Sequence, residues 1–167
     1  MEAVDPILQE LDAHYMNEAL REARKAGARE EVPVGAVVVM EGKVIGRAYN
    51  QVEMLKDATA HAEMLSLTQA QAALERWRLN DCTLYVTKEP CPMCAGAIIH
   101  TRIGRVVFGV GDLKAGALGG AFDLQSVKGL NHRFSVTKGV KEEESLSLLQ
   151  SFFRSRRTEK EKNDLPE

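Results

Sequence analysis

Two short clusters of metal-binding residues constrain this chain more than any other feature. They are His61-Ala62-Glu63 and Pro90-Cys91-Pro92-Met93-Cys94. One histidine and two cysteines supply three zinc ligands, which is typical of a catalytic site because the fourth tetrahedral position stays open to water. The alternative is a structural zinc knuckle or a set of buried thiols. A closed structural site needs a fourth ligand, and the remaining cysteine and histidines lie in separate segments: Cys82, His14, His100 and His132.

Both clusters lie where the sequence predicts that helices begin. Side chains two residues apart do not share a helix face, so His61 and Glu63 can serve one site only if it lies off a helix start. A helix predicted over residues 60–77 begins near His61, and Pro92 suits the first position of a helix over residues 91–101. Two helix N-termini would then point at one site and favour thiolates and a metal-bound hydroxide.

The order of the remaining elements predicts a layered α/β fold. The run from Val34 to Met40 is apolar on both faces, which indicates a sheet covered on both sides. Alternating strands and helices predict a three-layer α/β/α arrangement with a mixed five-stranded sheet, in which the first hairpin is antiparallel and the rest is parallel. The other predicted elements are helices over residues 8–26 and 142–157 and strands over residues 43–49, 83–88, 105–110 and 134–137.

Two segments are expected to lack regular structure. Residues 109–120 contain five glycines and are predicted to form a mobile loop beside the site. Residues 158–167 are charged and have a proline near their end, which predicts a disordered tail after a single domain over residues 1–157.

The charge balance and the cysteine count limit the partners and the compartment. The 22 basic and 24 acidic residues nearly cancel, so a nucleic-acid-binding surface has to be local. Three cysteines, two with metal-like spacing, do not make a disulfide framework and fit a reducing compartment. Met1–Pro6 has no signal-peptide pattern, and no apolar run reaches membrane-spanning length. We therefore expect a cytoplasmic protein.

The two clusters and three flanking segments resemble a known family. The flanking segments are Val32–Val37, Ile98–Gly109 and Asn131–Arg133. The metal motif is similar to that of the zinc-dependent cytidine and deoxycytidylate deaminase superfamily, and the flanking segments resemble the bacterial-type tRNA-specific adenosine deaminases. The likeness extends from Ala19 to Arg157.

This resemblance implies a fold, a reaction and an assembly. The fold would be cytidine-deaminase-like, with one zinc ion per chain, and the protein would be a homodimer. It would convert adenosine to inosine at the wobble position of a tRNA anticodon, by attack of zinc-bound hydroxide on C6 of adenine. Glu63, the only acid of the motif, would move the protons. Alternatively, Glu63 only complements the dipole of its helix.

The resemblance also assigns substrate-binding residues. The segment Val34, Gly35 and Ala36, with Ala62, would line the base pocket, and Asn50 would hydrogen-bond the flipped nucleoside. The alternatives are a buried strand for the first three and a turn residue for Asn50. The sequence departs from the family pattern at three positions: Ala48 replaces a glycine, Gln51 a basic residue and Lys88 an apolar residue.

Contacts to the tRNA anticodon stem-loop are assigned to two further segments. Asp112 can accept a hydrogen bond from a 2′-hydroxyl, and Lys114 can contact a phosphate. On the last predicted helix, the candidates are Phe152, Phe153, Arg154, Arg156 and Arg157. The alternatives are solvated charges and, for the phenylalanines, core packing.

Two rival functions stay open: a deaminase of a free nucleobase such as guanine or cytosine, and a catalytically silent zinc-containing subunit that binds RNA. The intact Glu63 argues against the silent subunit.

Overall fold

Five strands form one mixed sheet in the order β2-β1-β3-β4-β5 in the computed structural model, which describes residues 3–164. Strand β1 is antiparallel to both β2 and β3, whereas β3, β4 and β5 are parallel. The prediction of parallel pairing beyond the first hairpin is therefore wrong for β1 and β3. The reason is that β1 lies between β2 and β3, so the crossover from β2 to β3 passes over it. The strands are β1 Gly35–Met40, β2 Lys43–Tyr49, β3 Thr83–Lys88, β4 Arg105–Val110 and β5 Ser135–Lys138.

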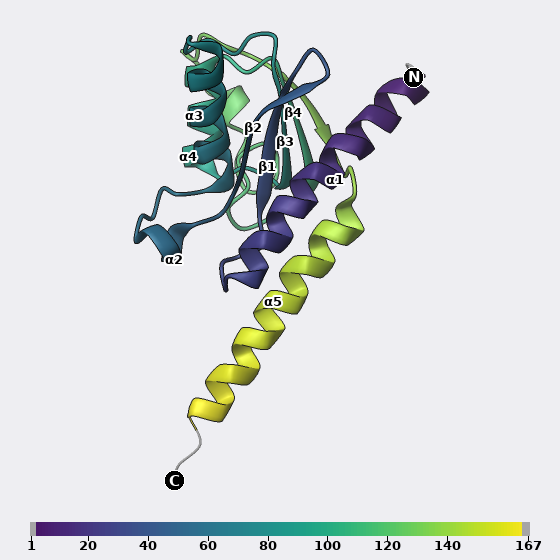
Figure 1. Cartoon of the computed structure of the whole chain (residues 1–167). Helices are drawn as coiled ribbons and strands as arrows, with labels where there is room; N and C mark the ends of the chain where they lie inside the picture. Colours follow the sequence, from purple (N-terminus) through teal and green to yellow (C-terminus); the bar gives the residue numbers. More distant parts are fainter. Residues whose placement is uncertain (1–2, 165–167) are drawn as a thin grey trace.

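Helices cover both faces of this sheet, which confirms the predicted three-layer α/β/α arrangement. Figure 1 shows α1 and α5 on one face and α3 and α4 on the other. The helices are α1 Pro6–Ala28, α2 Val52–Leu55, α3 Ala62–Leu74, α4 Pro92–Thr101 and α5 Glu142–Asn163, and a 3₁₀ turn spans Leu124–Ser126. Among the described residues, no helix has both the length and the apolar character needed to cross a lipid bilayer.

The strands divide the core into two halves because successive side chains point to opposite faces. On β1, Val38 packs into the cluster beneath α3 and α4, whereas its neighbours Val37 and Val39 pack against α1. Strand β3 repeats the alternation, with Leu84 on the first side and Tyr85 on the second. Each half of the core thus holds one layer of helices against the sheet.

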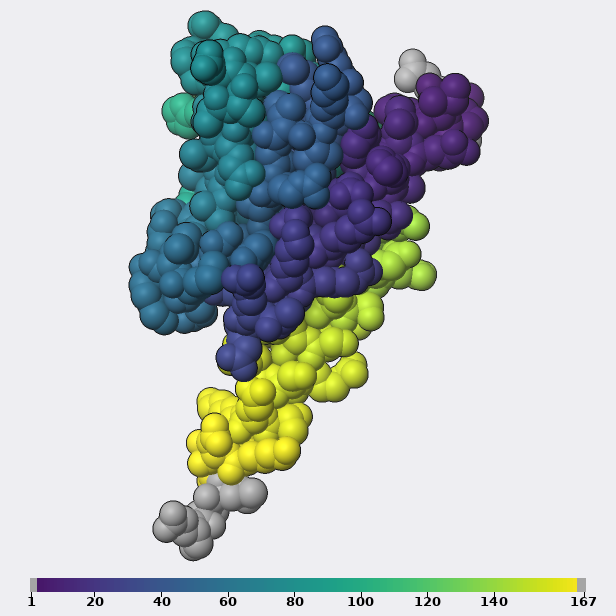
Figure 2. Space-filling model, in the orientation of Figure 1, coloured from purple at the N-terminus to yellow at the C-terminus, as the bar shows by residue number. Residues whose placement is uncertain are grey.

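The last helix is longer than predicted. It continues through residues 158–163, so the prediction of a disordered tail is wrong for these residues. They are mostly glutamate and lysine, which have good helix propensity, and Arg156 pairs with Glu159 one turn on at 3.9 Å. Figure 2 shows this end of α5, in yellow, extending beyond the rest of the surface. Residues 165–167 lie outside the described part, and the domain boundary at residue 157 stays a prediction.

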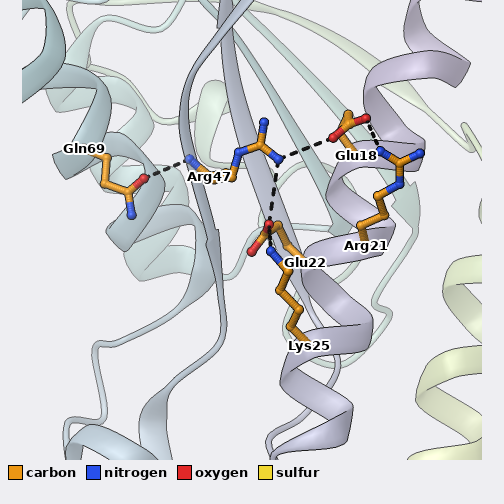
Figure 3. A network of polar contacts seen from close by, with 6 residues as sticks. All are labelled: Glu18, Arg21, Glu22, Lys25, Arg47 and Gln69. Carbon is orange, nitrogen blue, oxygen red and sulfur yellow. Dashed lines mark hydrogen bonds and ion pairs between the residues drawn. The ribbon is translucent and has the colours of Figure 1, made fainter.

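Polar contacts join the edge strand β2 to helices on both sides (Figure 3). The Arg47 guanidinium lies 3.4 Å from Glu18 and 3.9 Å from Glu22, both on α1. Its backbone N–H donates to Gln69 on α3 at 2.9 Å. Since this N–H is on the outer edge of the sheet, the bond occupies a donor that would otherwise be open to pairing with another strand.

Candidate active site

The three predicted ligand side chains meet at one point. His61 Nδ1 lies 3.6 Å from Cys91 Sγ and 3.5 Å from Cys94 Sγ. A tetrahedral zinc centre with ordinary Zn–N and Zn–S bond lengths places a nitrogen and a sulfur ligand about 3.6 Å apart. The donor atoms of all three residues lie within 4.8 Å of one another. The residues therefore fit a tetrahedral metal ion at this position.

Two helix starts place these side chains, as predicted. His61 and Cys91 are the N-cap residues of α3 and α4, and both have extended backbone conformations. Neither side chain caps its own helix, so both are free to turn toward the site. Pro92 occupies the first turn of α4, and Cys94 follows on the same turn. Because β3 runs almost directly into Cys91, the site lies beyond the carboxyl end of β3, where α/β sheets commonly bind ligands.

The ligand trio favours a thiolate even without a cation. The hydrogen bond from the Cys94 thiol, with a smaller contribution from His61, outweighs burial and lowers the pKa of Cys91 to about 3. In turn, the hydrogen bond with Cys91 raises the pKa of His61. Cys91 thus favours the thiolate, the form that binds a metal, whereas the same hydrogen bond raises the pKa of its donor, the Cys94 thiol.

Glu63 lies beside this trio but is not one of its members. The residue is only 4% exposed and lines the same cavity as His61 and Cys91. Burial raises the pKa of the Glu63 carboxyl above its ordinary value. A carboxyl group with a raised pKa can both accept and release a proton, which suits a general acid and base.

A cavity of about 1080 Å³ opens over the trio. This volume is sufficient for a nucleoside. Besides the trio's exposed members and Glu63, it brings together six of the residues assigned to the substrate: Val34, Asn50, Ala62, Asp112, Phe153 and Arg156. Phe152 lines it as well, and Phe153 is 45% exposed there. The long last helix thus contributes Phe152, Phe153 and Arg156 to the wall of the cavity that also contains His61 and Cys91.

Five predicted substrate residues do not line this cavity. Gly35 faces α1, where an added Cβ would clash with the Ala19 carbonyl oxygen, and its N–H donates to Thr87 Oγ1 at 3.2 Å. The clash shows that a glycine is required at residue 35 for the packing of α1. Ala36 is fully buried in the core beneath α3 and α4. The others are exposed charges outside the lining: Lys114, Arg154 and Arg157.

Asn50 lies at the cavity wall with its amide already engaged. Its Nδ2 donates to the Val32 carbonyl at 3.3 Å, and its Oδ1 accepts from Val52 N at 3.4 Å. These long bonds orient the amide without using all of its hydrogen-bonding capacity. Two of the departures from the family pattern lie nearby: Ala48 is buried in β2, and Gln51 is the N-cap of α2.

Lys88, the third departure, reaches the same cavity. Its Nζ lies 3.0 Å from Asp112 Oδ2, and Asp112 Oδ1 accepts from the backbone N–H groups of Lys114 and Ala115 at 2.9 and 3.1 Å. Burial alone would raise the pKa of Asp112, but these hydrogen bonds and Lys88 outweigh it and lower the pKa. Asp112 is therefore a fixed, ionised carboxylate at the rim.

Glu89 is a site residue that sequence reasoning missed. It is 5% exposed and accepts hydrogen bonds from the backbone N–H groups of Asp112, Leu118 and Gly120, at 3.1, 2.9 and 2.9 Å. Glycine is required at residue 116 because an added Cβ would clash with the Glu89 carboxylate. The glycine-rich segment is thus anchored by Glu89, where we predicted a mobile loop. Its signal was the acid directly before Pro90-Cys91.

Glu31 is the second missed residue. It is 1% exposed and accepts from the backbone N–H groups of Glu53 and Met54, at 3.1 and 2.6 Å. It thereby holds α2 next to Asn50. The sequence offered no signal for Glu31, because its partners are backbone groups more than twenty residues away.

Comparison with known proteins agrees with this geometry. The family model of the MafB19-like deaminases matches residues 11–157. A tRNA-specific adenosine deaminase from Bacillus subtilis is 48% identical over 149 residues, covering 89% of this chain and 92% of that protein. One from Haemophilus influenzae is 45% identical over 155 residues, covering 92% and 90%.

Solved structures show the same fold. One from a study of A-to-I editing by tRNA:A34 deaminases at the wobble position is 46% identical, with a TM-score of 0.79, and covers 81% of this chain and 99% of that one. A guanine deaminase from Nitrosomonas europaea is 24% identical, with a TM-score of 0.72 over 91% and 94% of the two chains, and shows the fold alone. The cytidine-deaminase-like fold is thus confirmed. This chain belongs to the MafB19-like deaminases and, within them, to the family of the bacterial tRNA-specific adenosine deaminases.

Proposed function

We propose that this protein hydrolyses adenosine to inosine at the wobble position of a tRNA anticodon, with one zinc ion per chain held by His61, Cys91 and Cys94. The observation that carries the proposal is that a buried carboxyl group, Glu63, shares one cavity wall with a ligand trio of tetrahedral zinc geometry. The relatives named as tRNA-specific adenosine deaminases, at 45–48% identity, support the substrate.

The ligand set fits zinc by its chemistry as well as its spacing. Two thiolates and one imidazole are common zinc ligands, and a site with three protein ligands leaves one position for a water molecule. When bound, zinc supplies the Lewis acidity that activates this water as a nucleophile near neutral pH. His61 would bind through Nδ1, the nitrogen that faces both sulfur atoms.

Glu63 would transfer the protons. Deamination requires a base that takes a proton from the attacking water and an acid that delivers protons to the ring nitrogen and the departing ammonia. Glu63 suits both steps because burial raises the pKa of its carboxyl group. Its position in the first turn of α3, next to the ligand His61, keeps it beside the reacting atoms.

The cavity walls suggest how a flipped nucleotide would be bound. Val34 and Ala62 offer apolar contacts to the base, and the Asn50 amide keeps hydrogen-bonding capacity toward it. Asp112 at the rim can accept a hydrogen bond from a 2′-hydroxyl. On the α5 side, the half-exposed Phe153 can stack on a neighbouring base, and Arg156 can contact the RNA backbone. A loop nucleotide is already partly unstacked, so flipping it costs less than extracting a paired base.

A free-nucleobase deaminase stays the rival enzyme. It would use the same ligands and the same carboxyl group, but it has no use for an aromatic and basic wall from α5. The silent-subunit alternative has little support, since Glu63 is intact and buried at the ligand trio. The test is to incubate the purified protein with an anticodon stem-loop bearing a wobble adenosine, and separately with free guanine and cytosine. Inosine in the RNA is expected. Deamination of the free bases alone would contradict the proposal.

We also propose that the protein is a homodimer in the cytoplasm. The basic end of α5 in a single chain is a small surface for tRNA binding, and a second copy of the chain would enlarge this surface. Sedimentation at micromolar concentration should give twice the chain mass of 18.4 kDa. A monomer that still edits RNA would contradict the dimer. A tRNA substrate is consistent with the cytoplasmic location that we predicted.

A further inference from the structure

Lys88 is a cation at the cavity that the proposed reaction leaves without a role. It is the last residue of β3, three positions before the ligand Cys91, and its side chain is 34% exposed. It lines the cavity together with Asp112, to which its Nζ is paired at 3.0 Å. An ammonium group has three N–H donors, so one ion pair leaves capacity for a second acceptor.

The lining of the cavity is rich in acids, and a nucleic acid strand entering it brings further negative charge. Among the described residues, the cations of the lining are Arg29, Lys88 and Arg156. The Arg156 guanidinium donates to the Glu30 carbonyl at 2.5 Å and lies over the Phe152 ring. The Arg29 guanidinium lies over the Tyr49 ring, 5.6 Å from its centroid. Lys88 is the cation of this set that lies directly beside the Asp112 carboxylate.

A phosphate can bind at the rim only if a cation offsets the negative charge of Asp112. Backbone N–H groups fix its carboxylate at the rim, and its lowered pKa keeps it ionised. An unscreened carboxylate would repel a phosphate that passes the rim. Lys88 neutralises Asp112 and can bind a phosphate oxygen with its remaining donors, as lysine does in many phosphate sites.

We propose that Lys88 binds a backbone phosphate adjoining the target nucleotide and so favours a nucleotide within an RNA strand over a free nucleoside or base. This inference rests on the proposed function. Lys88 would act as a specificity-determining residue for the substrate, because only a strand carries the phosphate that it binds. The competing role is purely structural, with Lys88 doing no more than orienting Asp112.

The test combines a change in the protein with a change in the RNA. Anticodon stem-loops are prepared with a neutral methylphosphonate in place of the phosphate on the 5′ or the 3′ side of the wobble adenosine. Wild type should lose about tenfold in kcat/KM on one of these two substrates, as expected for one charge-assisted hydrogen bond. For Lys88→Met, which keeps the length of the side chain and removes its charge, this loss should disappear. The modified substrates should react at least as fast as the unmodified one, because the unscreened Asp112 carboxylate repels only the charged phosphate.

Three variants serve as controls. Lys88→Gln repeats the test with a polar side chain in case Lys88→Met does not fold. Lys43→Met removes an exposed lysine at the start of β2, which does not line the cavity. This variant should keep the wild-type ratio of kcat/KM between the modified and the unmodified RNA. Asp112→Asn should lose at least as much kcat/KM on the modified substrate as wild type does, because Lys88 remains and no carboxylate competes for it. If Asp112→Asn reacted equally well with the modified and the unmodified RNA, Lys88 would act only through Asp112, and the inference would be overturned.

Two further outcomes would contradict the role of Lys88. In the first, folded Lys88→Met or Lys88→Gln still loses as much kcat/KM on the modified RNA as wild type does. In the second, wild type reacts with equal kcat/KM on all three RNAs. Either result, obtained with inosine forming in the unmodified RNA, leaves the proposed function intact. If wild type forms no inosine from the unmodified RNA, the proposed function fails and this inference fails with it.

Discussion

Glu89 Oε1 accepts a hydrogen bond from the backbone N–H of Asp112 at 3.1 Å, which ties the rim of the cavity to the segment that leads into the ligand Cys91. Glu89 Oε2 accepts two further backbone N–H groups, from Leu118 and Gly120. One buried carboxylate thus connects the segment of the proposed zinc ligands to a loop proposed to contact RNA.

Glu89→Gln should loosen this loop without removing zinc. The amide keeps one acceptor oxygen and introduces an NH₂ group that faces backbone donors, so at least one N–H loses its acceptor, at a cost of about 1–3 kcal/mol. We expect faster proteolysis within residues 111–120 and a lower kcat/KM. Limited proteolysis and steady-state kinetics are compared with Glu143→Gln, an exposed change on α5. Equal behaviour of the two variants would show that Glu89 does not anchor the loop.

Asp12→Ala should destabilise the fold far more than Asp81→Ala. Asp12 is 4% exposed and pairs with Arg105 through two bonds of 2.7 and 2.6 Å. Asp81 pairs with Arg76 at the surface through two bonds of 2.8 and 2.9 Å. Breaking a buried pair costs about 3–5 kcal/mol, whereas an exposed pair contributes less than about 1 kcal/mol. Urea unfolding of both variants measures the difference, and similar losses would contradict the assignment.

Removing the metal should expose one cysteine to alkylation. In the zinc-loaded protein, Cys91 and Cys94 are protected as ligands. After chelation, Cys91 should react with iodoacetamide at pH 7, because it is partly exposed and its pKa is lowered to about 3. Cys82 should stay unreactive, because it is 2% exposed and burial raises its pKa to about 11. Peptide mass spectrometry gives the order, and labelling of Cys82 before Cys91 would contradict it.

Neutralising the basic residues of α5 should weaken RNA binding and flatten its salt dependence. The triple change of Arg154, Arg156 and Arg157 to glutamine should reduce the slope of log K against log salt. On a single strand, the reduction is roughly 0.7 for each phosphate that the variant no longer neutralises. Binding is titrated at several salt concentrations, with Lys43→Gln as a control away from the cavity. An unchanged slope would show that these arginines are only solvated.

The ligand trio could be predicted from the sequence because its placement is local. Histidine and cysteine are typical zinc ligands. His61 and Cys91 directly precede their helices, and this position decides where their side chains point. The strand order was less accessible. Nothing in the sequence near β1 indicates that it inserts between β2 and β3, since pairing depends on segments far apart along the chain.

A simple cause explains why some predicted pocket residues do not line the cavity. Val34 lines the cavity, but side chains alternate along an extended segment, so Gly35 faces α1. Glu31 could not be assigned its role because it binds backbone N–H groups of a distant segment, which have no signature in the sequence. Glu89 had a signal, since it stands directly before Pro90-Cys91, but the distant backbone groups that it binds could not be predicted. The end of α5 was missed because a charged composition fits both a solvated helix and a disordered tail.

The most direct test of the proposed mechanism is single-turnover inosine formation by Glu63→Ala, measured beside its zinc content and compared with His61→Ala. Glu63 is not a member of the ligand trio, so Glu63→Ala should keep stoichiometric zinc, whereas His61→Ala should lose it. Removing a general acid and base should slow the reaction about 10²–10⁴-fold, or about 3–5 kcal/mol of barrier. If Glu63 only complemented the helix dipole, the change would cost tenths of a kcal/mol in stability and leave turnover intact. A zinc-loaded Glu63→Ala protein with near-normal turnover would therefore contradict the mechanism, and loss of zinc from it would show that Glu63 is a ligand.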